Sequence, residues 1–445
     1  MYKRDIKIKD NYDLVVVGGG MTGFSAAVAA ARRGLKTAII EKMGCLGGVA
    51  TSAGVCHLLG GRTYDDSLGR HFRNVRGIFD ELTDKLISKG AAIEPDTVNR
   101  QRNPHGWFPS LAAGVPFDVE KMKVAMDDMC KEAGVHIYYF TSFIDCEVED
   151  EMINTLILHN KSGLFGIGTK LVADTTGDAD VAYRSGCLTV LGRDEDNLMA
   201  PASLEMHVEN VNKEELLDYI QKNNTPRFRE LIRELRDKGI WTFPYEIFIA
   251  VQLNEEDVFM INTIRQVGVN GVDGESITEA MINGRKENMK LFEIMKEYFP
   301  GFKNARIKMI APVVGIRETR RIVGKYVLTV EDLCNGKVFD DSIAVSSYGW
   351  DLPDPNKPSH QPMEKVKTAS KFTHIPYRCL LPSPIKNLIV AGRCISVERE
   401  VLGPVRVMAP CMAMGQAAGI AAAISVKSNQ VFSEIDVKEV QSELE

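Results

Sequence analysis

A glycine motif near the amino terminus constrains the fold of this chain more than any other feature. Gly18, Gly20 and Gly23 form the pattern GxGxxG, directly after the β-branched run 13–17 (DLVVV) and directly before an alanine-rich stretch. The first glycine of such a pattern permits a tight turn, the second lets a pyrophosphate approach the backbone, and the third lets the helix pack closely on the sheet. The start of that helix offers N–H groups to phosphate. We therefore predict a β-turn-α-β unit that binds a dinucleotide.

Glu41 completes this fingerprint. It lies 23 positions after Gly18, at the end of the next predicted strand, 36–41. A carboxylate at this point accepts hydrogen bonds from ribose hydroxyls and disfavours a 2′-phosphate. The expected cofactor is therefore FAD or NAD, and not NADP.

Three further segments favour FAD, the longer of these two cofactors. The glycine pair 47–48 is unnecessary in an NAD domain, but its backbone can pass closely beside a long extended ligand. The segment 174–180 (DTTGDAD) follows a predicted strand at the carboxyl edge of the sheet, where α/β sheets bind ligands. Near the end of the chain, 391–393 (AGR) and 403–406 (GPVR) lie around the start of a Gly/Ala-rich helix. Arg406 would there stabilise the negative charge of a reduced flavin.

Composition limits the classes of protein and partner. The chain has 445 residues, 44% apolar and 26% charged, which is typical of a globular protein of two or three domains. With 54 Lys and Arg against 60 Asp and Glu, its net charge of −6 argues against a nucleic-acid-binding surface. The sequence starts without a signal-like stretch and has no apolar run long enough to span a membrane, so we expect a cytoplasmic protein without a membrane partner. The nine cysteines and eight histidines are dispersed, so neither disulfides nor a metal site is expected.

The chain is expected to form two domains, with the second inserted into the first. Residues 143–174 alternate apolar and polar side chains around polar turns, which predicts strands joined by hairpins. From 187 to 375 the pattern changes to amphipathic helices mixed with short strands. The predicted fold class is α/β: a Rossmann-like cofactor domain (1–186 and 376–445) with a parallel sheet and a β-meander, and an α+β substrate domain (187–375). Helices are predicted over 67–89, 118–133, 214–221, 228–238, 276–298 and 403–423.

These motifs together resemble a known family. The matching stretches are 15–42, 44–54 (GCLGGVATSAG), 173–186 (ADTTGDADVAYRSG), 299–333 and 375–423. In them the sequence resembles the bacterial FAD-dependent oxidoreductases of the glutathione-reductase-like superfamily. The resemblance implies FAD bound in an extended form, with Glu41 on the adenosine ribose and Arg393 and Arg406 close to the isoalloxazine. The full set of expected cofactor contacts is Gly18, Gly20, Met21, Thr22, Gly23, Glu41, Lys42, Gly47, Gly48, Thr51, Asp174, Gly177, Asp178, Gly392, Arg393, Val405 and Arg406.

Two departures from the superfamily pattern narrow the chemistry. Disulfide reductases carry a CxxxxC pair after the second glycine pair, whereas Cys45 and Cys56 here are eleven positions apart, so dithiol chemistry is not expected. The other glycine cluster, 268–274, lacks a strand-turn-helix context and is predicted to be a loop, not an NAD(P)H fold. The flavin is then reduced by a small-molecule substrate or by a partner protein. Oxygen or an electron-acceptor protein is expected to reoxidise the flavin. Whether the chain forms a homo-oligomer is left open.

Catalysis would require a proton acceptor or donor beside the flavin. His374 and Tyr377 precede the last cofactor segment, and His57 follows the second glycine pair. These three residues and Arg320 are the candidate catalytic residues. A structural role is the alternative for each, since an isolated histidine or tyrosine is commonly part of the core.

Arginines dominate the candidate substrate contacts. The segment 316–324 contains Arg317, Arg320 and Arg321, and arginine forks bind carboxylates well. Pairing with Glu318 or other acids is the alternative. Arg317, together with Arg378 and Tyr348, is expected to bind the substrate. The segments 102–107 and 348–351 are aromatic loops that would either line a pocket or anchor the chain.

The function predicted from these residues is transfer of hydride between a small polar organic substrate and bound FAD. Two alternatives stay open. In the first, FAD serves a tRNA-modifying protein, which would require a basic face. In the second, the chain is a non-catalytic nucleotide-binding module.

Overall fold

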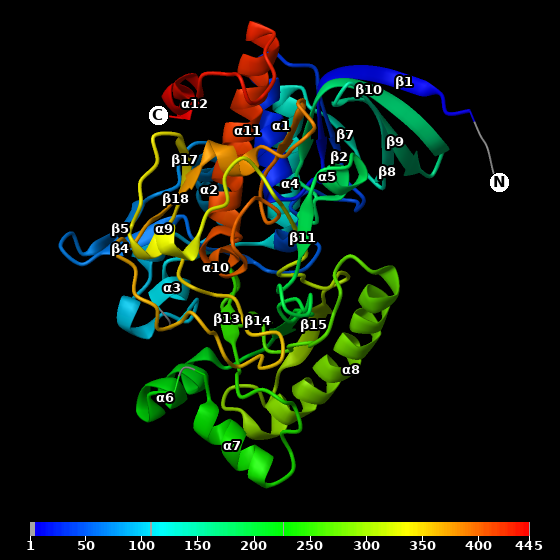
Figure 1. Cartoon of the computed structure of the whole chain (residues 1–445). Coiled ribbons are helices and arrows are strands. Elements are labelled where there is room, and N and C mark those ends of the chain that lie inside the picture. Colours follow the sequence, from blue (N-terminus) through cyan, green and yellow to red (C-terminus); the bar gives the residue numbers. More distant parts are fainter. Residues whose placement is uncertain (1–4, 107–108, 226, 445) are drawn as a thin grey trace.

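The computed structural model describes residues 5–106, 109–225 and 227–444 (Figure 1). The predicted β-turn-α-β unit is present as β1 (Ile8–Val17), α1 (Met21–Ala31) and β2 (Thr37–Ile40). In the main sheet β1 pairs in parallel with β2 on one side and with β10 (Gly163–Asp174) on the other. β7 (His136–Tyr138) extends the parallel part beyond β2, and β19 (Leu388–Val390) extends it beyond β10. This is the predicted α/β class.

A three-stranded meander leads into this sheet. β8 (Ser142–Glu149), β9 (Met152–Asn160) and β10 follow one another as antiparallel strands, as the alternation in 143–174 predicts. On the edge away from β1, β10 is long enough to pair with two strands in turn. Its first half pairs with β9, and its second half lies between β1 and β19. Its last residue, Asp174, therefore lies opposite Val17 at the carboxyl edge of the sheet.

Helices α1 and α11 (Met408–Ser428) lie side by side on this sheet (Figure 1). A Cβ atom on Gly415 would come within 2.1 Å of the Thr22 carbonyl oxygen, and one on Gly419 within 2.3 Å of that of Ala26. The glycines therefore permit the close approach of the two helices. Among the described helices, α11 alone is long and apolar enough to cross a membrane, and most of it is buried inside the protein.

Two predicted helices differ in the structure. The helix predicted over 403–423 is divided into α10 (Leu402–Val405) and α11, because Val407 is extended (φ −70°, ψ 161°). The helix predicted over 67–89 begins only at Ile78. Its first part is the turn of a hairpin formed by β4 (Arg62–Asp65) and β5 (Arg70–Arg73). The Asp65 carboxylate accepts hydrogen bonds from the amides of Ser67 and Leu68 (2.8 and 3.2 Å), and such local bonds favour a turn over a helix.

The second half of the molecule, which lies below the first in Figure 1, has its own hydrophobic core. Its antiparallel sheet has the order β13 (Ala250–Gln252), β14 (Phe259–Ile261), β12 (Met206–Glu209) and β15 (Arg306–Ile310). Helices α6 (Lys213–Asn223), α7 (Arg229–Asp237) and α8 (Gly274–Tyr298) cover it. One face of the sheet, including Met206 and Phe259, packs into this core, whereas Val251 and Met260 on the other face pack against the first. The sheet is thus the boundary between the two halves.

The hydrophobic cores place this boundary differently from the sequence. Leu328, Phe339 and Leu352 pack into the core that contains α1 and α11. The second core is formed by residues between Met206 and Ala305. The division at residue 375 stays a prediction, and the cores indicate an earlier return to the cofactor half.

The remaining elements connect these parts. They are β3 (His57–Leu58), α2 (Ile78–Ser88), α3 (Pro109–Ala112), β6 (Val115–Pro116), α4 (Val119–Ala133), α5 (Asp180–Arg184), β11 (Thr189–Leu191), β16 (Arg320–Ile322), α9 (Val330–Cys334), β17 (Ser342–Ser346), β18 (Thr373–Pro376) and α12 (Val437–Leu444). As predicted, α4 ends at Gly134, which is left-handed (φ +83°). The glycine cluster 268–274 forms turns that lead into α8, in agreement with its predicted loop structure.

Candidate functional site

The glycine turn after β1 leaves open space where a dinucleotide would lie. Gly18 has φ +101°, and its N–H donates to the Ile40 carbonyl (2.9 Å). A Cβ atom on Gly23 would lie 1.9 Å from the Gly18 carbonyl oxygen, so the helix depends on glycine there. A Cβ atom on Gly20, in contrast, would have no atom within 4 Å. No side chain caps the start of α1. The turn therefore presents free backbone and open volume, which fit a pyrophosphate.

The second glycine pair lies against this turn. The Gly47 amide donates to the Gly19 carbonyl (2.8 Å), and a Cβ atom on Gly48 would lie 3.1 Å from the Cα of Gly20. Both members of the pair have positive φ (+106° and +56°), which glycine adopts readily. The Thr51 hydroxyl donates to the Leu46 carbonyl (2.6 Å) and fixes the return of the loop. The two glycine segments predicted to follow one extended ligand are thus adjacent in space.

Glu41 lies at the end of β2, beside the first turn. Its carboxylate is buried and accepts hydrogen bonds from the amides of Gly19 and Met43 (both 2.7 Å). Burial raises the pKa of Glu41, while these two N–H groups oppose the rise. Each oxygen keeps a second lone pair that can accept a ribose hydroxyl. Its neighbour Lys42 is exposed.

Within the segment 174–180, Asp174 bonds to the backbone of its own segment, and the predicted contact with the cofactor stays a prediction. Its carboxylate is fully buried and accepts bonds from the amides of Thr176, Val181 and Ala182 (2.9–3.1 Å). Burial raises the pKa of Asp174 to about 6. Its carboxylate fixes the start of α5 and the loop before it through these backbone bonds.

Asp178 joins this loop to the one after β19. Its Oδ1 accepts from Arg393 Nη2 (2.7 Å) and from the Thr319 hydroxyl (2.8 Å). A Cβ atom on Gly177 would lie 3.0 Å from Arg393 Nη2, and one on Gly392 would lie 2.6 Å from Thr22 Oγ1. The segments around 177 and 392 therefore converge with the start of α1, as predicted for one cofactor site.

Arg406 belongs to a charged group at the break between α10 and α11. Its Nη2 donates to the carbonyl oxygen of Asp351 (2.6 Å) and to Asp351 Oδ2 (3.3 Å). The Tyr348 hydroxyl donates to the same carboxylate oxygen (3.2 Å). Burial alone would raise the pKa of Asp351, but the charges of Arg406, Arg317 and Arg265 outweigh it and lower this pKa. Val405 is buried in α10 immediately before the break.

Arg317 lies in this charged group beside an arginine that sequence analysis missed. Arg317 donates to the Pro201 carbonyl (2.7 Å) and to Asn262 Oδ1 (3.3 Å). Arg265 donates to the same Asn262 oxygen (2.7 Å) and to the Ser203 hydroxyl (2.8 Å). Burial and the charges of Arg265 and Arg406 lower the pKa of Arg317 to about 9. Arg265 follows β14 in an ordinary apolar context, so no motif marks it.

Glu205 is the second acidic residue of this charged group, after Asp351. It lies on the face of the antiparallel sheet that contacts the loop after the second glycine pair. Met206 and Val208 of β12 point into the second core, so their neighbours point the other way. His207 hydrogen-bonds to the Gly54 carbonyl (2.8 Å), and the Cβ of Glu205 lies 3.5 Å from a Cβ placed on Gly54. Glu205 is 1% exposed, and its Oε2 has no hydrogen-bond partner among the described residues. Burial raises its pKa to about 8, although the charges of Arg317 and Arg265 oppose this rise.

The predicted catalytic residues do not join this group. Arg320 bonds to the Asp178 carbonyl and the Asp180 carboxylate (3.2 and 3.0 Å). The Tyr377 hydroxyl donates to the Phe432 carbonyl (2.9 Å), beyond the end of α11 opposite to Arg406. These contacts hold both side chains within the fold, and their catalytic roles stay predictions.

The two candidate histidines are also held elsewhere. His57 is buried in β3, where desolvation lowers its pKa to about 3 and keeps it neutral. His374 in β18 contacts the Ser342 hydroxyl (3.4 Å) and lines a shallow depression with Leu328 and Phe339. Burial lowers its pKa. No contact of either ring with the arginines described above is present in the described part of the chain.

The other arginines from the sequence analysis form ion pairs. Arg378 is exposed and pairs with Asp341 (2.8 Å), and its role in substrate binding stays a prediction. Arg321 is buried against Glu318 (3.2 Å), the alternative weighed for this segment. In the aromatic loop 102–107, Arg102 pairs with Glu214 (2.6 Å), and Trp107 lies outside the described residues.

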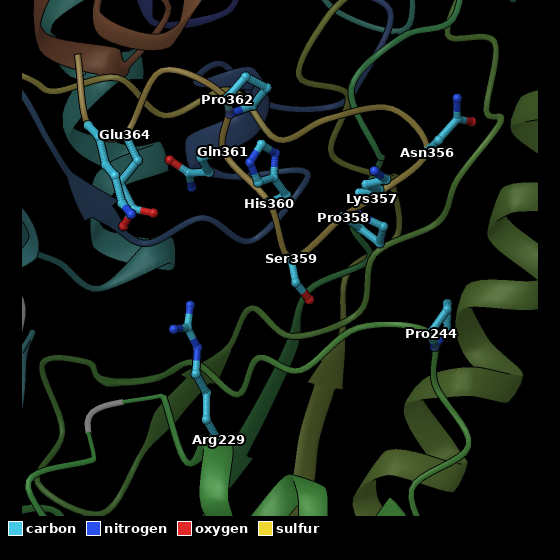
Figure 2. Close-up of a pocket in the computed structure, with 11 residues that line it drawn as sticks. Arg229, Pro244, Asn356, Lys357, Pro358, Ser359, His360, Gln361, Pro362 and Glu364 are labelled. Atoms are coloured by element: carbon cyan, nitrogen blue, oxygen red, sulfur yellow. The ribbon is translucent and has the colours of Figure 1, made fainter.

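A solvent-facing pocket of about 460 Å³ lies between the first turn of α7 and the loop 356–365 (Figure 2). Arg229 extends into it from the first turn of α7, toward the loop that carries His360 and Gln361. The Gln361 amide donates to Asp351 Oδ1 (2.8 Å). The full lining is Arg229, Pro244, Asn356, Lys357, Pro358, Ser359, His360, Gln361, Pro362, Glu364 and Lys365. The pocket contains none of the cofactor glycines, so it is separate from the dinucleotide turn.

Known proteins resemble this chain over different lengths. The family model described as FAD dependent oxidoreductase matches residues 13–444. A dihydrolipoyl dehydrogenase of Trypanosoma brucei brucei is 34% identical over 124 residues, 28% of this chain and 24% of that protein. A leghemoglobin reductase of Glycine max is 53% identical over 45 residues, 10% of this chain and 9% of that protein. The chain thus matches about a quarter or less of the length of these curated relatives.

Solved structures resemble the whole chain only distantly. A geranylgeranyl bacteriochlorophyll reductase-like protein from Thermoplasma acidophilum aligns with 97% of this chain and 82% of its own, with a TM-score of 0.46 and 13% identity. The L-proline dehydrogenase from P. horikoshii aligns with 98% of this chain and 99% of its own, with a TM-score of 0.44 and 12% identity. At these scores the likeness carries no inference about activity.

Proposed function

The chain belongs to the FAD dependent oxidoreductase family, and from that premise we propose that it transfers hydride between a small polar organic substrate and FAD. The observation that carries this proposal is the contact between the two glycine segments beside the uncapped start of α1. An extended dinucleotide requires such a continuous backbone surface. When bound, FAD supplies the two-electron redox chemistry.

We assign the cofactor contacts by their local chemistry. Gly18, Gly20 and the N–H groups of Met21 and Thr22 would bind the pyrophosphate, because they offer donors without an obstructing side chain. Glu41 would accept the ribose hydroxyls. Gly48 and Gly392 would allow close passage of the ligand beside the start of α1. Arg406 would place positive charge near the flavin ring.

The substrate site is proposed at the charged group of Glu205, Arg265, Arg317, Asp351 and Arg406. These side chains lie between the two halves, and Glu205 faces the loop that follows the second glycine pair. A buried carboxylate with a raised pKa is suited to accept or donate a proton near neutral pH. Glu205 therefore replaces His57, His374 and Tyr377 as the candidate acid–base residue.

The reductant is proposed to be the substrate itself. The glycine cluster 268–274 forms turns before α8 and offers no second strand-turn-helix unit for a nicotinamide cofactor. Reoxidation by oxygen or by an electron-acceptor protein completes the cycle. Anaerobic bleaching of the bound flavin by members of a metabolite panel tests this step directly.

Gly20→Ala is the sharpest test of the cofactor site. A Cβ atom here meets no protein atom within 4 Å, and Gly20 has φ −66°, so the apoprotein should fold with unchanged stability. The methyl group would occupy the space assigned to the pyrophosphate, and we expect FAD affinity to fall roughly tenfold or more. Calorimetric titration of the apoprotein with FAD measures this.

The matched control is Gly274→Ala, at the first residue of α8. A Cβ atom there is equally unobstructed, and no atom of the glycine turns lies within 4 Å of it. It should leave FAD affinity unchanged. Equal FAD affinity in the Gly20→Ala and wild-type proteins, or purified protein that is colourless and refuses FAD, would refute the proposal.

A further inference from the structure

We propose that Arg265, Arg317 and Arg406 form a binding site for the carboxylate of the substrate, which is an organic acid bearing a hydroxyl or amino group. This inference rests on the proposed function and specifies its substrate class. It starts from an imbalance of charge in this group between the two halves, in which Glu205 and Arg265 are buried and Asp351 keeps a third of its side chain exposed.

Arg265, which is buried, and Arg317, which is half-buried, lack the partners that the other buried arginines have. Their guanidiniums bond to neutral oxygens of Asn262, Ser203 and Pro201, and neither forms an ion pair with a carboxylate among the residues that the structure describes. A buried guanidinium without an anion is costly, because desolvation is not offset by a counter-charge. The group is therefore incomplete without an anionic ligand.

The comparison with the arginines of the cofactor half shows that this is a local property. Arg62 pairs with Asp80 (2.8 Å), and both Arg321 and Arg399 pair with Glu318 (3.2 and 2.8 Å). All three are less than a tenth exposed. Elsewhere in the molecule the fold thus neutralises buried arginines within the chain.

The carboxylates of the group do not remove the imbalance. Asp351 bonds to Arg406 (3.3 Å) and to the Tyr348 hydroxyl. Glu205 forms no ion pair, and its Oε2 has no hydrogen-bond donor among the described side chains and amides. Three guanidiniums thus face two carboxylates, which leaves at least one positive charge for a ligand.

The chemistry of the unpaired atoms defines the ligand. The Nε atoms of Arg265 and Arg406 are buried and lack acceptors in the described structure. Those of the paired arginines Arg62 and Arg399 lack them too, so the missing ion pair of Arg265 is what distinguishes this group. A carboxylate would supply these acceptors, and the planar guanidinium binds it through paired bonds. Glu205 Oε2 would accept a hydrogen bond from a hydroxyl or amino group of the same molecule.

The neighbouring pocket fits the approach of an anion. Arg229, Lys357 and Lys365 line it, and its one acidic residue, Glu364, faces Arg227 (3.6 Å). Gln361 connects the pocket wall to Asp351 (2.8 Å). A basic entrance raises the local concentration of anions.

The test is titration of the FAD-loaded protein with matched acids and amides. Lactate, malate and alanine are compared with lactamide, malamide and alaninamide, and binding is followed by the shift of the flavin absorption spectrum and by calorimetry. We expect at least one acid to bind roughly 10- to 100-fold more tightly than its amide, as charge-assisted hydrogen bonds imply. Amides that bind as tightly as acids, or no binding by any acid, would overturn the inference.

Variants then locate the site. Arg317→Gln should weaken acid binding roughly 10- to 100-fold, and Arg317→Lys should restore part of it, because lysine keeps the charge without the fork. The control is Arg285→Gln, at an exposed position of α8, which should leave binding unchanged. Unchanged acid binding in Arg317→Gln would contradict the inference even if wild-type protein binds acids.

The two levels of proposal fail in different ways. Protein that binds no FAD refutes the proposed function. Yellow protein whose flavin is bleached by a neutral substrate, and which binds no acid, leaves the proposed function standing and overturns only the carboxylate site.

Discussion

The glycine turn after β1 and the charged group around Arg265, Arg317 and Arg406 differ in the chemical groups that they present to a ligand. We call the second the arginine group. The turn is formed by backbone: Gly18, Gly20 and Gly48 present N–H groups and open space, and Glu41 is held by two amides. The arginine group is formed by side chains that come from distant parts of the chain. Its charges are unbalanced, whereas the buried arginines Arg62, Arg321 and Arg399 are paired with carboxylates. The difference separates the part of the fold that is complete by itself from the part for which we propose a ligand.

Breaking a completed ion pair should have the largest effect. Glu318 is fully buried, bridges Arg321 and Arg399, and accepts from the Ala200 amide (2.7 Å). Glu318→Gln would leave two buried guanidiniums without an anion, and we expect a loss of roughly 3–5 kcal/mol in the free energy of unfolding. Urea denaturation measures it. A loss below about 1 kcal/mol would mean that the pairing is not what stabilises these arginines.

Gly23→Ala tests the backbone nature of the turn. Its Cβ atom would lie 1.9 Å from the Gly18 carbonyl oxygen, so α1 must shift. We expect a loss of roughly 1–3 kcal/mol in stability, as for other overpacked sites, together with loss of bound FAD. Thermal unfolding and the ratio of flavin to protein absorbance check both effects. The Gly274→Ala variant is again the control.

Glu205→Gln tests the unpaired acid through pH. The folded-state pKa of Glu205 is raised from 4.5 to about 8. Because the folded state retains the proton, its contribution is fully present below about pH 4.5 and declines as pH rises toward 8. Stability of wild type relative to Glu205→Gln should therefore fall across this window. Denaturation midpoints for both proteins at several pH values measure the difference, and parallel curves would contradict the assignment.

The smallest effect is expected at the surface. Arg378 is half exposed and pairs with Asp341. Arg378→Gln should change the unfolding free energy by less than about 1 kcal/mol, because exposed ion pairs contribute little. Since the pair lies apart from the arginine group, the affinity for the substrate should also be unchanged. A clear rise in KM for the substrate would instead indicate that Arg378 contacts the substrate.

Local patterns predicted much of the fold correctly. The β-turn-α-β unit, the meander of 143–174 and the helix that ends at Gly134 depend on neighbouring residues, so the sequence is enough to predict them. The helix predicted over 67–89 was wrong in its first part, where Asp65 forms a side-chain turn. The break in the helix at Val407 was not predicted, because apolar residues continue on both sides of it.

Only part of the proposed substrate site was predicted, because local patterns do not reveal which distant side chains come together. Arg317, Tyr348 and Arg406 were among the expected ligand contacts and lie in one charged group. Glu205 and Arg265 were missed, since neither belongs to a motif. Tyr377 and Arg378 were favoured by their nearness in sequence to the last cofactor segment, but their side chains point to Phe432 and Asp341.

The sequence by itself determined that this chain has a turn for a dinucleotide, because glycine spacing and backbone conformation are local properties. Only the tertiary structure decided which charges are neutralised. Burial and counter-charge depend on segments around 205, 265, 317, 351 and 406 coming together, and no local pattern encodes that balance.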